Sequence, residues 1–316
     1  MKMNIVYSSD ENYVQHMAVS IFSLLENNKE IKEINIYILS NNISGKSKEE
    51  LSHIVEKEFR RNIIFIEFAP FKERLNLNME WSISLSSYAR LFLPEMLPDN
   101  CEKVIYIDCD TVICTSLLEL WNTDLKSSSV GGVLDTVLPQ FKTAVGLKKE
   151  DAYINAGILL IDINKWRNER TQDKFVQCIE EHNGRVPHHD QGTLNGVLHD
   201  EILVLNPRFN AMTPMFTTRY ENLFKLYQIA GKYYSKNEIL EAKRHPVIIH
   251  FVPEFVGRVW EYECRHPKKK LYREYLDCTI WRNQLVHTEM NESVKMRMIH
   301  WIQCRLPLAL QRIIGM

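Results

Sequence analysis

Short apolar segments alternate with amphipathic ones along the N-terminal part of the chain, and this alternation is the feature that most constrains the fold. The segments 4–9, 34–39 and 63–68 are rich in β-branched and aromatic residues, which is typical of buried strands. The segment after the first strand carries buried-type residues at helical spacing: Met17, Ser20, Ile21, Leu24 and Leu25. The segment 44–58 is predicted as a second helix, with Ser47 as its N-cap. Such alternation predicts an α/β fold whose largely parallel sheet is flanked by helices.

The alternation continues less regularly to residue 278, where a region of different character begins. We expect further strands at 104–107, 130–134, 154–163 and 201–205, and helices at 86–96 and 190–198. The aromatic-rich stretch 210–234 is irregular, so no single element is predicted there. We therefore expect one α/β domain over 1–278 and a tail over 279–316.

Size, charge and cysteine usage exclude several classes of protein. The 316 residues carry a formal net charge of −1, so no global field attracts nucleic acid. Seven scattered cysteines form no CxxC pair, which argues against a disulfide framework or a zinc knuckle and favours free thiols in a reducing cytoplasm. The chain enters a strand-like segment at once, and no apolar run approaches the roughly 18 residues of a membrane span. We expect a cytoplasmic protein.

The C-terminal tail is basic and amphipathic. Residues 295–316 carry four lysines and arginines and no acidic residue, interleaved with apolar side chains that include Trp301. A helix of this kind suits the surface of an anionic bilayer, which would make the protein peripheral on the inner face of the cell membrane. Docking of the same helix on the protein's own core is an equally good interpretation, and both stay open.

Two carboxylates follow a predicted buried strand. Asp108 and Asp110 come directly after the segment 104–107, and an extended backbone points such a pair to the same side. Because neighbouring carboxylates repel each other and lose hydration when buried, they favour a bound cation. His250, which ends the apolar run 247–250, could supply a third ligand from a neighbouring strand. Asp10 also follows a strand, and ligands of α/β sheets bind beyond the carboxyl ends of strands.

Several common site motifs are absent from the sequence. No GxGxxG follows the first strand, and neither GxxxxGK[ST] nor GxSxG occurs anywhere. These absences argue against a Rossmann dinucleotide site, a P-loop and a nucleophile elbow.

Six segments in a fixed order resemble glycosyltransferase family 8. They are NIVYSSDENY at 4–13, SYARL at 87–91, YIDCD at 106–110, YINAGILL at 153–160, HDQGTLN at 189–195 and IHF at 249–251. The resemblance covers about 4–275 and implies a GT-A fold, one α/β domain that binds a nucleotide sugar. It also implies retaining transfer of an α-linked hexose, galactose or glucose, from a UDP-sugar to a hydroxyl of a glycan, glycolipid or glycoprotein, as in lipopolysaccharide or polysaccharide biosynthesis.

The resemblance implies that Asp108, Asp110 and His250 are ligands of Mn²⁺, with Mg²⁺ as the alternative. Carboxylate oxygens suit both ions, and one imidazole nitrogen favours Mn²⁺. The ion would act as a Lewis acid that offsets the negative charge on the departing UDP.

Further positions match the donor site of the family. The uridine is assigned to Ser8, Asp10 and Asn12, the donor-facing arginine to Arg90, and the hexose pocket to Asp135, Asn155, Asp190 and Gln191. Asp10 could equally be a helix N-cap, or fill both roles. For Arg90 the alternative is a surface ion pair.

Three departures from the family pattern bear on the mechanism. Gly192 stands where bacterial galactosyltransferases of the family carry an aspartate, which removes one candidate nucleophile. Ser82 replaces a histidine near the sugars, so the acceptor or the hexose is expected to differ. The loop 252–258 after His250 is two residues longer than expected, and Arg258 is our substitute for a phosphate-binding lysine.

The resulting hypothesis places Gln191 closest to the anomeric carbon and lets Asp190 hold the sugar. Because a side-chain amide is a poor nucleophile, we expect front-face attack, with the departing phosphate oxygen taking the acceptor proton. Two alternatives remain. Asp108 and Asp110 also fit the DxDx[TV] loop of haloacid-dehalogenase-like phosphatases, and a non-catalytic saccharide-binding scaffold could keep the same fold.

Overall fold

A seven-stranded sheet forms the centre of the computed structural model, which describes residues 2–72, 85–286 and 294–313. The strand order is β3-β2-β1-β4-β7-β6-β8. The strands are β1 (Lys2–Asp10), β2 (Glu33–Asn41), β3 (Asn62–Glu67), β4 (Lys103–Ile107), β6 (Val130–Leu134), β7 (Ile154–Asp162) and β8 (Ile202–Val204). All of them run in one direction except β7, which is antiparallel to both β4 and β6. The predicted α/β fold with a mostly parallel sheet is confirmed.

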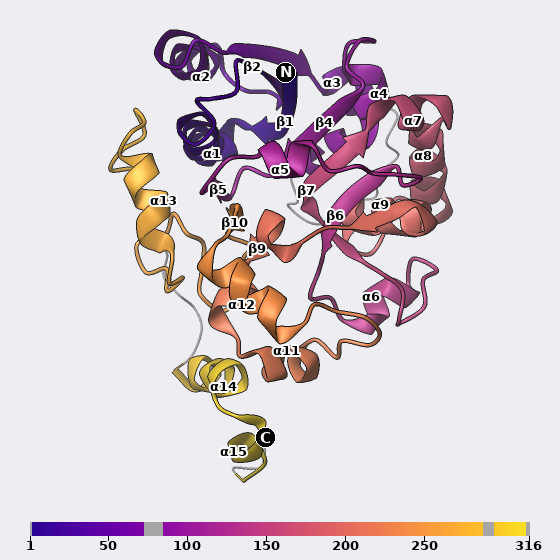
Figure 1. Cartoon of the computed structure of the whole chain (residues 1–316), viewed down its shortest axis with the longest axis vertical. Coiled ribbons are helices and arrows are strands. Elements are labelled where there is room, and N and C mark those ends of the chain that lie inside the picture. The colour runs from indigo at the N-terminus through magenta and orange to yellow at the C-terminus, as the bar shows by residue number, and fades with distance from the viewer. Residues whose placement is uncertain (1, 73–84, 287–293, 314–316) are drawn as a thin grey trace.

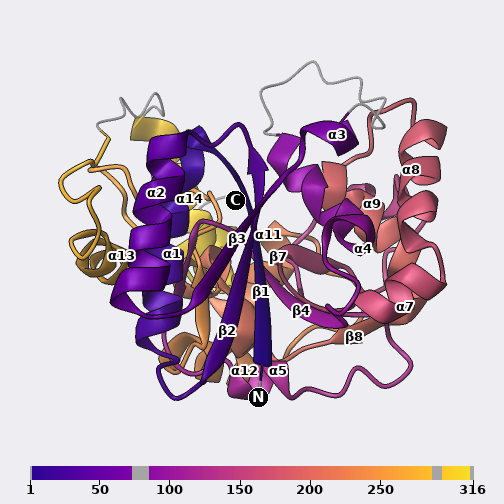
Figure 2. The same ribbon diagram turned by 90° about the horizontal axis from the view of Figure 1, so that it is seen from above.

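Helices cover both faces of this sheet, and Figure 2 shows the strands standing between the two groups. One group contains α1 (Val14–Glu26), α2 (Gly45–Ser52) and α13 (Lys269–Leu276). The other contains α4 (Leu93–Met96), α7 (Ile163–Asn168), α8 (Thr171–Glu181) and α9 (His189–Leu198). Since both faces are covered, the central strands are apolar almost without interruption. Further helices are α3 (Ala69–Lys72), α5 (Leu118–Trp121), α6 (Pro139–Thr143) and α12 (Lys236–Arg244).

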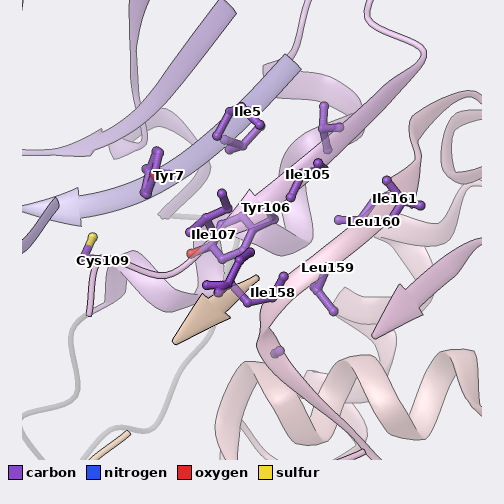
Figure 3. Close-up of a cluster of buried hydrophobic side chains, with 14 of the residues drawn as sticks. Ile5, Tyr7, Ile105, Tyr106, Ile107, Cys109, Ile158, Leu159, Leu160 and Ile161 are labelled. Atoms are coloured by element: carbon purple, nitrogen blue, oxygen red, sulfur yellow. The ribbon is translucent and has the colours of Figure 1, made fainter. Parts of the chain in front are cut away.

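The core between β1, β4 and β7 fixes the strand ends on which the site is built. Ile5 of β1 pairs with Ile105 of β4, and Ile105 pairs with Leu160 of β7. These side chains are fully buried, and Figure 3 shows them packed beside Tyr7 and Ile107. Burial of one such aliphatic side chain stabilises a fold by about 1.5–3 kcal/mol. The residues that follow β4 therefore extend from a rigidly packed strand.

A second, three-stranded sheet brings the C-terminal half of the chain to the end of β4. It has the order β5-β10-β9, with β5 (Thr111–Ile113), β9 (Ala211–Met212) and β10 (Ile248–His250). In the antiparallel pair of β10 with β5, His250 lies opposite Thr111. This register places the imidazole beside the residue that precedes Thr111, which is Asp110.

Three local predictions need correction. Ser47 is not the N-cap of α2, because Ser44 occupies that position and accepts a hydrogen bond from the Ser47 amide at 3.2 Å. The segment 44–58 changes after α2 into a π-helical turn, His53–Glu58, and 86–96 is a 3-10 turn, Leu85–Phe92, followed by α4. The stretch 210–234, for which no single element was predicted, contains three short elements: β9, α10 (Thr213–Thr217) and α11 (Tyr220–Leu226).

The tail forms α14 (Val294–Arg305) and α15 (Leu308–Ile313), and α14 is docked on α11 (Figure 1). The side-chain amide of Asn222 donates hydrogen bonds to the carbonyls of Gln303 and Leu306, at 2.7 and 2.8 Å. Met298 and Trp301 nevertheless remain 64% and 56% exposed. The tail is thus anchored on the protein and still presents apolar side chains to solvent. Within the described parts of the chain, no helix has the length and apolarity to traverse a bilayer.

Candidate functional site

Asp108, Asp110 and His250 converge at the end of β4. One ligand atom from each lies within 4.8 Å of those of the other two. The His250 Nε2 atom is 3.1 Å from Asp110 Oδ1 and 3.9 Å from Asp108 Oδ2. The predicted grouping is therefore present, although the residues come from the two separate sheets.

A buried amide orients the imidazole. The side-chain oxygen of Asn210 lies 3.1 Å from Nδ1 of His250, and Asn210 is fully buried. An amide oxygen can only accept, so Nδ1 donates to it, and Nε2, which faces the carboxylates, is the nitrogen that would bind a cation. Asn210 belongs to the stretch for which no element was expected. Nothing in its local sequence indicates this contact.

The electrostatics of the three residues favour an additional positive charge. Burial raises the pKa of Asp108, even though Arg90 and His250 oppose the rise. Burial also acts against ionised Asp110, but the adjacent imidazole outweighs it and lowers the pKa of that carboxyl. The pKa of His250 is raised because the attraction of Asp110 exceeds the effect of burial. Two carboxylates and one imidazole nitrogen fit a hard or borderline divalent cation such as Mn²⁺ or Mg²⁺.

Strand β7 passes so close to these ligands that it needs a glycine. A Cβ on Gly157 would lie 2.2 Å from Cε1 of His250 and 2.8 Å from Oδ2 of Asp108. The Gly157 carbonyl also accepts the backbone hydrogen bond of Asp108 at 2.7 Å. Gly157 therefore both holds Asp108 and leaves room for the imidazole.

Arg90 is buried behind the carboxylates, 4% exposed, which excludes the surface ion pair. Its guanidinium lies 2.8 Å from Asp108 Oδ1 and 3.0 Å from Asp190 Oδ2. It also lies over the ring of Tyr106, 4.3 Å from the ring centroid. A planar guanidinium can hold two carboxylates at fixed spacing in this way. The sequence predicted Arg90 as a donor-facing residue but did not indicate these partners.

A first hollow of about 530 Å³ opens beside the three candidate ligands. The predicted site residues that line it are Ser8, Asp10, Asn12, Arg90, Asp108, Asp110 and Arg258. Asp10 does act as an N-cap, since its side chain accepts from the Asn12 amide at 3.0 Å. Arg258 Nη1 is 3.5 Å from Asp110 Oδ2, and its guanidinium lies over Trp260. Ligand sites usually have this volume and a few converging polar groups.

A second hollow of about 540 Å³ shares Arg90 and Asp108 with the first. Its walls include the predicted residues Asp135, Asn155, Asp190 and Gln191. The Gln191 amide nitrogen donates to Asp135 at 2.9 Å, and its oxygen accepts from the Ala156 amide at 3.0 Å and from Asn155 at 3.2 Å. Asp135, Asn155 and Gln191 thus form a hydrogen-bonded group at this hollow, and Asp190 joins its wall through the ion pair with Arg90.

The departures at positions 192 and 82 have different outcomes. A Cβ on Gly192 would lie 1.8 Å from the backbone carbonyl oxygen of Pro187, so no side chain fits there without a backbone shift. Glycine at this position therefore fits the close packing of α9 against Pro187. Ser82 lies outside the described residues.

Comparison with known proteins points to one family. Residues 4–263 match the profile of glycosyl transferase family 8. A Haemophilus influenzae protein, named provisionally as a glycosyltransferase, is 34% identical over 272 residues, 84% of this chain and 74% of that protein. The lipopolysaccharide 1,2-glucosyltransferase of Escherichia coli is 25% identical over 289 residues, 89% of this chain and 79% of that protein.

Solved structures agree as well. The galactosyltransferase LgtC, crystallised in complex with donor and acceptor sugar analogs, has a TM-score of 0.70 and 26% identity over 88% of this chain and 96% of its own. The Streptococcus pneumoniae glycosyltransferase GlyE shares the fold. Its TM-score is 0.62 at 20% identity, over 87% of this chain and 60% of its own. The expected GT-A fold is confirmed. With the family profile matched from the first strand to beyond His250, the chain belongs to glycosyl transferase family 8.

Proposed function

We propose that the protein is a retaining hexosyltransferase that moves an α-linked galactose or glucose from a UDP-sugar to a saccharide hydroxyl. The observation that carries this proposal is the convergence of Asp108, Asp110 and His250 at the junction of two hollows. These three residues would hold Mn²⁺ or Mg²⁺. A divalent cation bound there supplies Lewis-acid compensation for the charge that builds on the departing diphosphate.

The two hollows suit the two halves of a nucleotide sugar. We assign the first hollow to the nucleoside diphosphate, with Ser8, Asp10 and Asn12 at the uridine and Arg258 at the phosphates. Arg258 supports this assignment because a guanidinium can make two parallel hydrogen bonds to phosphate oxygens.

The second hollow is assigned to the transferred hexose. Asp135, Asn155, Asp190 and Gln191 supply short carboxylates and amides, which recognise sugar hydroxyls at fixed angles. Because the hollows share Arg90 and Asp108, a ligand can extend from one into the other.

The proposed reaction proceeds by front-face attack. The bond from the anomeric carbon to the phosphate oxygen breaks, the acceptor oxygen binds the anomeric carbon on the same face, and its proton moves to the departing phosphate. Asp190 holds the sugar, and Gln191 stabilises positive charge beneath the anomeric carbon. Since both acceptor sites of the Gln191 oxygen are in use, Gln191 must exchange one hydrogen bond for the sugar during the reaction. Gly192 offers no side chain as a nucleophile.

We further propose that the acceptor is a cell-surface saccharide such as a lipopolysaccharide, the substrate class named for the Escherichia coli relative. A cytoplasmic enzyme could reach such an acceptor at the inner face of the membrane through its tail. Exposed Met298 and Trp301, together with exposed Arg305, support contact with an anionic bilayer. Nucleic acid is not a proposed partner.

A donor screen tests the proposal. UDP release is measured for several UDP-sugars with Mn²⁺ and then with EDTA. We expect release from UDP-galactose or UDP-glucose, with loss of turnover in EDTA. Asp108→Asn should lower turnover by roughly a hundredfold or more, and Asp200→Asn, an exposed carboxyl, should leave it unchanged.

Three results would contradict the proposal. Near wild-type turnover by Asp108→Asn would refute the assignment of the metal ligands. Hydrolysis of p-nitrophenyl phosphate without a sugar nucleotide would favour the phosphatase, and UDP binding without turnover would favour the scaffold.

A further inference from the structure

One half-buried carboxyl in the second hollow has no role in the donor site described above. Glu254 lines this hollow together with Val252 and Pro253, and with Pro214 from α10. It belongs to the loop 252–258, the segment in which the sequence is longer than its family pattern. The residue is therefore a feature of this chain's own loop.

The surroundings of Glu254 leave much of its hydrogen-bonding capacity unused. The hydroxyl of Tyr227, just after α11, donates a hydrogen bond to the carboxyl. No lysine, arginine or histidine among the described residues forms an ion pair with it. A carboxylate has two oxygens with about four acceptor positions, so one hydroxyl partner leaves the others available to a ligand.

The charge state of Glu254 supports the same view. Burial raises the pKa of Glu254 to about 7, against the opposing effect of the Tyr227 hydrogen bond, and Asp135 adds to the rise. A hydroxyl donor from a ligand would stabilise the ionised form, whereas a second anion would not.

The loop that carries Glu254 is held from behind. Phe255 stacks on His300 of α14, with ring centroids 3.9 Å apart and planes 28° from parallel. Because α14 is docked on α11, both the loop and Tyr227 rest on packed elements. Glu254 can therefore hold its position while a ligand enters.

We infer that Glu254 binds the acceptor, accepting a hydrogen bond from a hydroxyl of an uncharged acceptor saccharide while Tyr227 positions its carboxyl. This inference rests on the proposed function, since the hexose is assigned to the same hollow. It gives the enzyme a preference: acceptors with a carboxylate or phosphate at this point are repelled by Glu254 and Asp135, and neutral sugars are favoured.

Binding to the full chain, loaded with UDP and Mn²⁺, tests the inference by saturation-transfer NMR. The probes are lactose, methyl β-galactoside, methyl β-glucoside and methyl β-glucuronide. We expect wild type to bind at least one neutral sugar and to bind the glucuronide much more weakly. Glu254→Ala should weaken the affinity for the neutral sugar by about tenfold or more. Glu254→Gln should fold normally and narrow the difference in affinity between the glucoside and the glucuronide. Tyr227→Phe should weaken binding of the neutral sugar by less than Glu254→Ala does.

Donor measurements separate this inference from the function on which it rests. UDP affinity should stay within twofold in Glu254→Ala, because Glu254 does not line the first hollow. In the control Glu241→Gln, an exposed glutamate of α12, both UDP affinity and acceptor-free hydrolysis of the UDP-sugar should stay within twofold. The inference is overturned if Glu254→Ala and Glu254→Gln both bind the neutral sugars as wild type does. It is also overturned if wild type hydrolyses the donor but binds none of the four sugars. Failure of donor hydrolysis and UDP binding in wild type would instead refute the proposed function.

Discussion

Replacement of Gly157 by alanine tests the geometry of the metal ligands more sharply than removal of a ligand, because it leaves every ligand in the sequence. The new methyl carbon would lie 2.2 Å from Cε1 of His250 and 2.8 Å from Oδ2 of Asp108. Real side chains do not approach to such distances, so the imidazole, the carboxylate or the strand must move. The required shift of the ring is on the order of 1 Å.

None of these groups can move freely. Both ring nitrogens of His250 have partners at 3.1 Å, Asn210 on one side and Asp110 on the other. Strand β7 is paired on both edges, and the Gly157 carbonyl accepts the Asp108 amide. Overpacking of such a position usually costs about 1–3 kcal/mol of stability. A disturbed ligand orientation typically lowers metal affinity by about 10–100-fold, and a misplacement of about 1 Å can reduce turnover by about a hundredfold.

Three measurements on Gly157→Ala examine this reasoning. Calorimetric titration with Mn²⁺ in the presence of UDP reports the affinity, UDP release reports the turnover, and urea unfolding reports the stability. The matched control is Gly45→Ala in the first turn of α2, where a Cβ would meet no atom within 4 Å. A folded Gly157→Ala protein with metal affinity and turnover within twofold of wild type would refute the placement of His250.

Three further outcomes are expected. Arg90→Ala should lower the free energy of unfolding by about 3–5 kcal/mol in urea, because it leaves the buried carboxylate of Asp190 and the half-buried carboxylate of Asp108 without their cation; a loss below about 1 kcal/mol would contradict this. Burial, with Lys268, lowers the pKa of His266 to about 3, so below pH 6.5 only the unfolded chain takes up the proton and stability falls as the pH falls. His266→Phe should reduce that slope by about 1 kcal/mol per pH unit in unfolding curves between pH 6 and 4, and an unchanged slope would show that the ring is charged in the fold. Trp301→Ser should lower the fraction of the protein that sediments with anionic vesicles, while UDP binding is retained. An equal sedimented fraction would show that the exposed face of α14 does not contact the membrane.

The sequence predicted the strands and the residues at their ends because both depend on local pattern. Asp108 and Asp110 follow a β-branched run, and a parallel arrangement brings the ends of β1 and β4 to the same edge of the sheet. The direction of β7 was not predictable in the same way. An apolar run indicates that a strand is buried, but it contains no information on the strand's polarity.

The parts of the site that escaped prediction depend on contacts between distant segments. Asn210 reaches His250 through the pairing of β9 with β10, which no local spacing indicates. The N-cap of α2 was placed at Ser47 because that residue has a glutamate three positions on. Ser44 takes the position instead, since Glu11 from another segment accepts hydrogen bonds from both serine hydroxyls.

The buried guanidinium of Arg90 gives a physical reason why the two hollows act as one site. One oxygen of Asp108 lies against Arg90, and its other oxygen faces His250. The same guanidinium holds Asp190, which lines only the second hollow. A candidate metal ligand and a candidate sugar-binding carboxylate are therefore kept at fixed spacing by one rigid, always charged group. Because the charges are arranged before the donor binds, little reorganisation is needed when the diphosphate and the hexose enter together.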